Sequence, residues 1–180
     1  MMIMDENKGE SANELEALEL YVESERPLVN IQLRNGEECN SGLFDGLMKT
    51  LEHPKVLYRW LPNHYMYVTE NNLYQDKAYY SCSNRFDSFV GHVDSEDLAC
   101  LMIETGDMFQ GVNVNVLLTD FNNEGEFILP HGHTFRVRNS TYYTQNEFNK
   151  LLLKVESYER ASTLSDLYHI KSITLYKMYY

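Results

Sequence analysis

The spacing of apolar residues changes near residue 55, and this change limits the class of fold that the chain can adopt. Before it, apolar side chains recur every three or four positions, which is the period of amphipathic helices. Beyond it, they occur in short or alternating runs between polar and glycine-containing segments, which is typical of strands. Helices followed by a series of strands predict an α+β fold rather than a regular alternation of the two.

The first third of the chain predicts a helical lead-in, with Pro27 suited to the first turn of its second helix and Gly36 to the end of that helix. The three helices are expected at residues 13–24, 27–36 and 43–51. Residues 1–12 are polar and are predicted to be flexible. The rest is expected to form a single domain, in which a helical lead-in (13–54) packs on a β-rich core (55–180).

Short strands and one further helix are predicted after the lead-in. The strands are expected at residues 56–61, 66–69, 78–83, 98–104, 112–116, 127–129, 135–138 and 170–176, and the helix at residues 146–160. The expected architecture is therefore a sandwich-like core of short strands beneath the helical lead-in.

The charge of the chain argues against nucleic acid as a partner. The formal net charge is −12, from 27 acidic and 15 basic residues, whereas a phosphate-binding surface needs an excess of lysine and arginine. Residues 1–55 hold twelve acids and five bases, which places −7 of the total there. This acidic segment is read either as a solvated helix face or as a docking surface for a basic partner.

Cysteine and histidine usage indicates neither a disulfide framework nor a metal site. The three cysteines have no paired spacing, and two histidines on one turn (His131 and His133) lack further ligands nearby in the sequence. No apolar run reaches the roughly 18 residues of a membrane span, and the N-terminus lacks the pattern of a signal peptide. The cytoplasm is therefore the default location, although export by a dedicated apparatus or membership of a longer chain would leave the same pattern.

Three short segments combine residues that carry chemistry. Arg59 lies inside the apolar segment LYRW, and a buried guanidinium has a geometry that suits a diphosphate. Ser81 and Ser83 flank one residue of the aromatic segment AYYSCS. Glu124 and Glu126 lie two positions apart in FNNEGEFILP, so an extended backbone directs both carboxylates to one side. Two carboxylates held close together acquire different pKa values, which is useful for acid–base chemistry.

The order of these segments resembles that of the arginine–serine–glutamate class of mono-ADP-ribosyltransferases, which includes bacterial toxins and eukaryotic ecto-enzymes. Arg59, Ser81 and Glu126 follow one another at separations of 22 and 45 residues. The resemblance extends over nearly the whole chain. It is carried by ALELYVESERPLVNIQLRNG, LYRW, YYSCS, GVNVN with FNNEGEFILPHGHTFRV, and SITLY.

The resemblance implies a role for each matched residue that faces NAD⁺. Arg59 would bind the phosphates, and Ser81 would hydrogen-bond the catalytic glutamate and help to hold the nicotinamide ribose. Ser83 would support the strand. Glu126 would bind the ribose hydroxyls and stabilise the oxocarbenium-like charge that develops as nicotinamide leaves. One aromatic residue, Phe86 or Phe89, would pack on the nicotinamide ring, and Phe86 is our choice.

The acceptor side of the implied site lies just before Glu126. Glu124 would orient and deprotonate the acceptor, and in the family a glutamate at this position accompanies arginine acceptors. Phe121 occupies a position where family members often carry an aromatic residue that contacts the protein substrate. The implied substrates are thus NAD⁺ and a protein with an exposed arginine, without a metal.

Two departures from the family pattern affect the implied NAD⁺ site. Trp60 follows Arg59 where the family usually has glycine, so this residue either offers only its backbone to NAD⁺ or narrows the pocket. Cys82 replaces the threonine between the two serines. Residues 141–169 form a longer connection than the family core requires.

The leading hypothesis is transfer of ADP-ribose from NAD⁺ to an arginine side chain of a protein. NAD⁺ glycohydrolase activity would use the same residues with water as the acceptor. A catalytically inactive binding module is the alternative that Trp60 favours, and an unrelated α+β interaction domain would require all the segment matches to be accidental.

Overall fold

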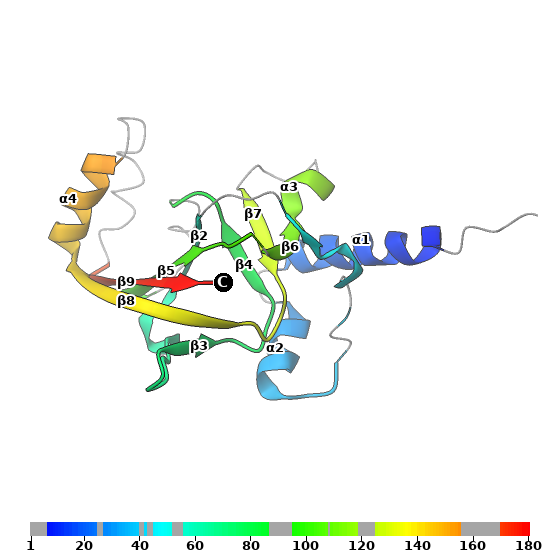
Figure 1. The fold of residues 1–180 in the computed structure, drawn as a ribbon, viewed down its shortest axis with the longest axis horizontal. Helices are drawn as coiled ribbons and strands as arrows, with labels where there is room; N and C mark the ends of the chain where they lie inside the picture. Colours follow the sequence, from blue (N-terminus) through cyan, green and yellow to red (C-terminus); the bar gives the residue numbers. More distant parts are fainter. Residues whose placement is uncertain are drawn as a thin grey trace, which may run out of the picture. The chain divides into compact units, whose positions relative to one another are not determined.

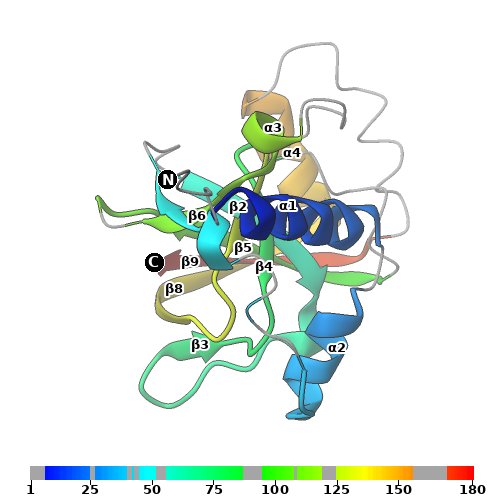
Figure 2. The same cartoon turned by 90° about the vertical axis from the view of Figure 1, so that its right-hand side faces the viewer.

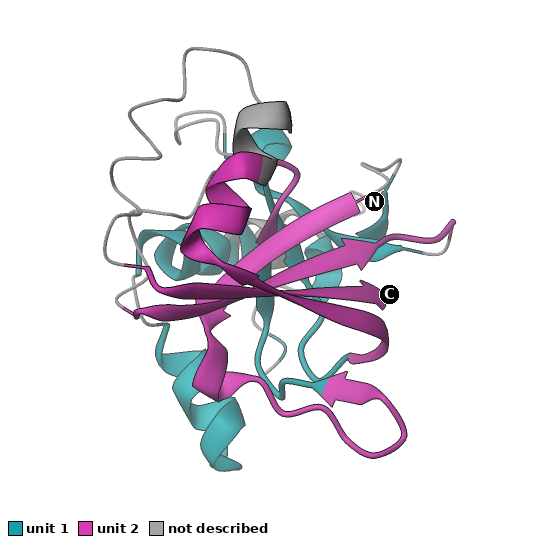
Figure 3. Ribbon diagram, turned by 90° about the vertical axis from the view of Figure 1, so that its left-hand side faces the viewer, with its two compact units in different colours: residues 1–52, 75–81, 108–133 teal, residues 53–74, 82–107, 134–180 magenta. Residues whose placement is uncertain are grey.

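The computed structural model describes residues 7–24, 27–39, 42, 45–51, 56–86, 95–107, 109–118, 125–155 and 170–180. The chain divides into two compact units (Figure 3). Unit 1 comprises residues 1–52, 75–81 and 108–133, and unit 2 comprises residues 53–74, 82–107 and 134–180. The division falls inside one strand, β4 (Tyr80–Ser83), so Ser81 belongs to unit 1 and Ser83 to unit 2.

Unit 1 places helices on one face of a group of short strands (Figures 1 and 2). Its strands occur in the order β1-β6-β7-β4, and β6 is antiparallel to both β1 and β7. Besides β4, its elements are α1 (Asn7–Glu23), α2 (Leu28–Asn35), the 3₁₀ turn η1 (Asp45–Leu47), β1 (Lys49–Thr50), β6 (Gln110–Asn113), α3 (Val114–Leu117) and β7 (Glu126–Leu129).

The core of unit 1 is formed where these helices meet the strands. Leu18 of α1 and Val29 of α2 pack in one apolar cluster with Tyr79, Val112 and Ile128. The helices are thus held mainly by burial of one face, which is the usual source of stability for short helices.

Unit 2 is dominated by long strands that pair in register. β5 (Asp97–Glu104) is antiparallel to β2 (Val56–Pro62) and parallel to β9 (Ser172–Tyr179). β9 is in turn antiparallel to β8 (Thr134–Thr144), with an irregularity in the register between Val137 and Asn139. The unit also contains the 3₁₀ turn η2 (Asn63–Tyr65), β3 (Leu73–Gln75, of which Gln75 belongs to unit 1) and α4 (Gln145–Val155).

The structure confirms the α+β class and most of the predicted elements. α2 begins after Pro27, and Gly36 closes it in the left-handed conformation with φ of 69°, as expected for a glycine that follows a helix. α1 begins at Asn7, six residues before the predicted start. β8 and β9 extend further than the alternation of apolar residues indicated. No helix among the described residues is long and apolar enough to cross a membrane.

Three local predictions were wrong. The described part of segment 43–51 forms one 3₁₀ turn and a two-residue strand instead of a helix, since Leu51 N donates to Phe109 O and extends the pairing with β6. Residues 66–69 form no strand, and the nearby strand is β3 instead. The valine alternation of 112–116 ends at Asn113, where α3 begins.

Asn30 fixes helix α2 to the strand that carries Ser81. Its side chain is buried, its Oδ1 accepts from Tyr79 N at 3.0 Å, and its Nδ2 donates to Tyr21 Oη at 2.9 Å. A buried backbone N–H needs an acceptor, and the N–H of Tyr79 obtains one from the Asn30 side chain of α2. One amide therefore links α1, α2 and the start of β4.

The variant Asn30→Ala should lower the free energy of unfolding by about 2 kcal/mol, because it leaves the Tyr79 N–H buried without its acceptor. The measurement is urea denaturation followed by circular dichroism. Asn35→Ala is the control, since Asn35 lies on the same helix but its amide binds Glu37 at the exposed surface. Equal midpoints for the two variants would contradict the role given to Asn30.

Candidate functional site

Ser81 and Glu126 are brought together in unit 1. Ser81 Oγ donates a hydrogen bond to Glu126 Oε1, and both side chains are partly buried. Glu126 shares a face of β7 with Ile128, two residues later, and Ser81 lies two residues after Tyr79, which immediately precedes β4. Tyr79 and Ile128 both belong to the core cluster. The Ser81–Glu126 pair therefore lies next to the apolar cluster that packs beneath the helices.

The backbone of Glu126 is held separately from its carboxylate. With its side-chain amide in the orientation that hydrogen bonding favours, Asn115 in α3 accepts through its amide oxygen from Glu126 N at 3.1 Å and from Gly125 N at 3.3 Å. Gly125 is buried and has φ of 64°, a conformation that glycine adopts without strain. Ser81 of β4 thus contacts the side chain of Glu126, and Asn115 of α3 contacts its main chain.

A tyrosine–aspartate contact lies immediately before β4, two residues from Ser81. Tyr79 Oη donates to Asp45 Oδ1 at 2.5 Å, and the ring of His131 meets the Tyr79 ring edge-on at 4.9 Å between centroids. Burial, followed by the hydrogen bond to Asp45, raises the pKa of the Tyr79 phenol far above its usual value. Tyr79 therefore stays neutral and serves as a hydrogen-bond donor in a fixed position.

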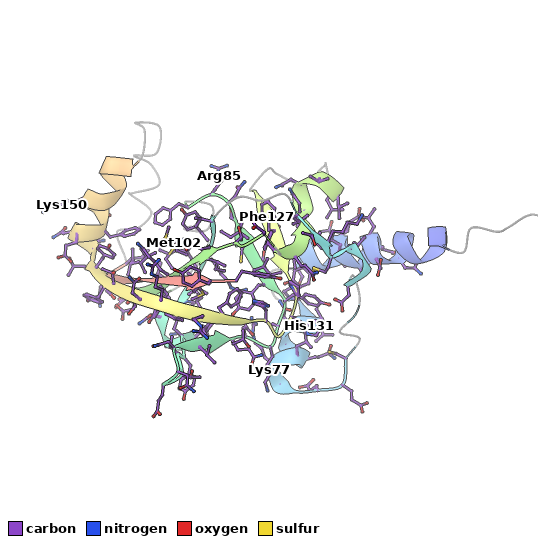
Figure 4. All side chains as sticks on the ribbon, in the orientation of Figure 1. Lys77, Arg85, Met102, Phe127, His131 and Lys150 are labelled. Atoms are coloured by element: carbon purple, nitrogen blue, oxygen red, sulfur yellow. The ribbon has the colours of Figure 1, made fainter. Side chains whose placement is uncertain are left out.

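The described residues, which include the two histidines of the turn after β7, contain no group of three potential metal ligands. His131, labelled in Figure 4, lies in this turn, and its Nε2 is 4.0 Å from Asp45 Oδ2. Burial lowers the pKa of His133 below its usual value, which favours the neutral ring.

Arg59 lies in strand β2 of unit 2, among apolar neighbours. Leu57, two positions earlier on the same strand face, and Leu101, its cross-strand partner on β5, are both fully buried. The Arg59 side chain itself is partly exposed. A guanidinium beside buried leucines needs hydrogen-bond or anionic partners, and binding of the NAD⁺ phosphates by Arg59 stays a prediction.

The Trp60 side chain lies on the opposite face of β2, because successive side chains alternate along a strand. Its indole is 8% exposed and packs edge-on against Phe86 at 5.3 Å and Phe148 at 5.8 Å between ring centroids. Its Nε1 donates to Phe86 O at 3.2 Å. Of the two possibilities left by the sequence, this geometry favours an indole turned away from Arg59.

Two further predicted residues lie beside this aromatic cluster in unit 2. Ser83 is the cross-strand partner of Tyr58 and therefore shares the face of Tyr58 and Trp60. Its Oγ accepts from Arg85 N at 3.0 Å, which fixes the turn after β4. The half-buried Phe86 packs against Tyr58 at 5.2 Å between centroids, and its contact with nicotinamide stays a prediction.

The predicted acceptor residues, Phe121 and Glu124, lie outside the described residues, as does Phe89, the alternative to Phe86. Sequence reasoning missed Asn30, Tyr79 and Asn115 as residues that position the site. Asn30 and Tyr79 fall within segments that carry the family resemblance, but nothing in the sequence shows that they touch. Asn115 was predicted only as a polar position of a strand. Because it lies in a helix instead, nothing in the sequence pattern indicated its contact with Glu126.

The chain is similar to known proteins in its structure, whereas comparison of its sequence finds no match. No family model matches the chain, and no curated protein matches its sequence. The structure of the ATR domain of SpvB from Salmonella is 16% identical, with a TM-score of 0.57, over 92% of this chain and 98% of that one. An ADP-ribosyltransferase from Clostridium botulinum is 14% identical, with a TM-score of 0.57, over 96% of this chain and 89% of that one.

A third similar structure contains a bound dinucleotide. Exoenzyme S from Pseudomonas aeruginosa, in complex with human 14-3-3 protein beta and bound to carba-NAD, is 16% identical with a TM-score of 0.55. The match covers 96% of this chain and 76% of that one. These likenesses establish that the chain has the fold of the bacterial mono-ADP-ribosyltransferase toxins.

Replacing Trp60 with glycine should destabilise the protein by about 4 kcal/mol, because it empties the centre of a packed aromatic cluster. The same variant should gain no affinity for NAD⁺, since the indole lies on the face opposite Arg59. Urea denaturation and calorimetric titration with NAD⁺ measure the two effects. Trp60→Phe keeps an aromatic ring and should lose much less stability. Tighter NAD⁺ binding by Trp60→Gly would show that the indole obstructs the pocket.

Proposed function

We propose that this chain, which has the fold of the bacterial mono-ADP-ribosyltransferase toxins, transfers ADP-ribose from NAD⁺ to an arginine side chain of a protein. The observation that carries the proposal is the hydrogen bond from Ser81 of β4 to Glu126, the first residue of β7. These are the serine and the glutamate that the family resemblance selected from the sequence.

Glu126 is proposed to stabilise the transition state. As the bond between ribose C1 and the nicotinamide nitrogen breaks, positive charge develops on the ribose, and a fixed carboxylate lowers the energy of that charge. Ser81 donates to one carboxylate oxygen, which fixes the orientation of the group before NAD⁺ arrives. The electron pair of the broken bond leaves with nicotinamide, so no metal is needed to accept it.

Arg59 is proposed to bind the diphosphate of NAD⁺. The guanidinium presents several N–H donors in one plane, which suits phosphate oxygens better than a lysine ammonium does. Its position beside the buried Leu57 and Leu101 supports this role, because a guanidinium in apolar surroundings needs an anionic or hydrogen-bonding partner. Ser83 is proposed to support β4, Trp60 to contribute only its backbone, and Phe86 to contact the nicotinamide ring.

Glu124 and Phe121 are proposed to select the acceptor. Glu124 would hold the arginine guanidinium in a bidentate pair and accept its proton as the new bond to ribose C1 forms. Phe121 would contact the protein surface around that arginine. The bound carba-NAD of the similar Exoenzyme S supports NAD⁺ as the other substrate.

The two alternatives left by the sequence can be distinguished by their products. NAD⁺ glycohydrolase activity would release free ADP-ribose, because water would replace the arginine. A non-catalytic binding module was favoured only by Trp60, and the packing of its indole against Phe86 and Phe148 reduces the support for that alternative.

The variant Glu126→Gln should reduce the labelling of arginine-rich proteins by labelled NAD⁺ about 10²- to 10³-fold, since it removes the charge that stabilises the transition state. The control is Glu70→Gln, an exposed glutamate of unit 2 that should leave labelling unchanged. Absence of NAD⁺ turnover by the unmodified protein, despite binding of NAD⁺, would overturn the proposed function.

The variant Glu124→Gln should separate the two reactions of the site. Transfer to arginine should fall by about 10²-fold or more, because the acceptor loses its general base. Release of free ADP-ribose should persist, since Glu126 and Ser81 remain in place. The assay measures nicotinamide release and labelled protein in the same sample, and a proportional loss of both would assign Glu124 to the NAD⁺ side instead.

A further inference from the structure

The main chain that carries Glu126 is held by a side chain from another element. Asn115 of α3 lies against two successive backbone N–H groups, those of Gly125 and Glu126, so its amide is assigned with the oxygen facing them, the orientation that satisfies both donors. Two consecutive N–H groups converge on one acceptor only when the residue that joins them has a helical or left-handed conformation. Gly125 has φ of 64°, which meets this requirement.

Asn115 is itself held in place by the core of unit 1. Val114, the residue before it, is 1% exposed and belongs to the same apolar cluster as Ile128, two positions after Glu126. Leu118 N donates to Val114 O at 2.8 Å and closes the single turn of α3. The Asn115 amide and the strand that carries Glu126 are thus fixed to the same apolar cluster.

Asn113 provides a comparison within the same segment. It precedes α3 and its side chain makes no capping hydrogen bond. Its buried Oδ1 has no hydrogen-bond partner among the described residues. The Asn115 side chain therefore contacts the backbone of Glu126, whereas Oδ1 of Asn113, two positions earlier, meets no donor among the described residues.

We infer that Asn115 is a positioning residue for the proposed reaction: it fixes the backbone at Gly125 and Glu126 so that the carboxylate meets Ser81 and the ribose in the required orientation. This inference rests on the proposed function. Ser81 alone restrains only the end of a side chain with three rotatable bonds, and rotation of the backbone at Gly125 would displace the whole carboxylate. A displacement of about 1 Å is enough to cost about 10²-fold in rate.

The first test measures the backbone directly and does not depend on catalysis. Amide hydrogen exchange by nuclear magnetic resonance should show that Asn115→Ala speeds exchange at Gly125 and Glu126 about tenfold, because both N–H groups lose their acceptor. Asn115→Asp keeps an oxygen in the same place and should preserve slow exchange. Asn113→Ala should leave both amides unchanged, and the amides of β5 and β9 report whether each variant is folded.

The second test measures turnover of NAD⁺ by the same proteins. Asn115→Ala should lower kcat about 10²-fold while the KM for NAD⁺ stays within about twofold, since Arg59 and the rest of the NAD⁺ contacts are retained. Asn115→Asp should recover most of the lost kcat, and Asn113→Ala should match the unmodified protein. A change confined to KM, or equal losses in the two Asn115 variants, would overturn the inference.

The two tests separate the failure of this inference from the failure of the proposed function. Turnover by the unmodified protein with unchanged exchange and unchanged kcat in Asn115→Ala would overturn the role of Asn115 alone. Absence of turnover by the unmodified protein would overturn the proposed function, and with it any role of Asn115 in catalysis.

Discussion

Side-chain alternation along β4 and β7 ties the candidate catalytic pair to the core of unit 1. Glu126 lies on the same face of β7 as the buried Ile128, and Ser81 lies two positions after the buried Tyr79. The apolar cluster that holds the helices therefore also sets the position of the carboxylate. A shift of either strand by one residue would move all its side chains to the opposite face. The strand pairing that stabilises unit 1 therefore also specifies the positions of Ser81 and Glu126.

The elements that the sequence predicted well are those with long, regular patterns. β2 and β5 were predicted from continuous apolar runs, and α2 from a proline and a glycine at its ends. Segment 43–51 was misread because its apolar spacing fits a helix, whereas its last residues pair with β6. The strand predicted over 112–116 ends at Asn113 because α3 begins at Val114, and the contact of Asn115 with the backbone of Glu126 joins distant residues in a way that periodicity does not encode.

The candidate site was predictable only to the extent that a family pattern could be recognised. Ser81 and Glu126 were selected from their order and spacing, and the structure places them in contact. The residues that hold them, Asn30 and Asn115, are ordinary asparagines in the sequence, since their importance lies in which backbone groups they meet. Trp60 is the opposite case, because it stood out in the sequence as a departure from the family pattern. In the structure its side chain packs in an aromatic cluster.

The burial of Trp60 also gives the protein a built-in spectroscopic probe. It is the single tryptophan of the chain, and its indole lies among the aromatic rings of unit 2. Its intrinsic fluorescence therefore reports on the packing of that unit, whereas far-ultraviolet circular dichroism reports on the backbone of both. Coincident transitions by the two signals would show that the chain unfolds as one cooperative body, and separated transitions would show that the units unfold independently.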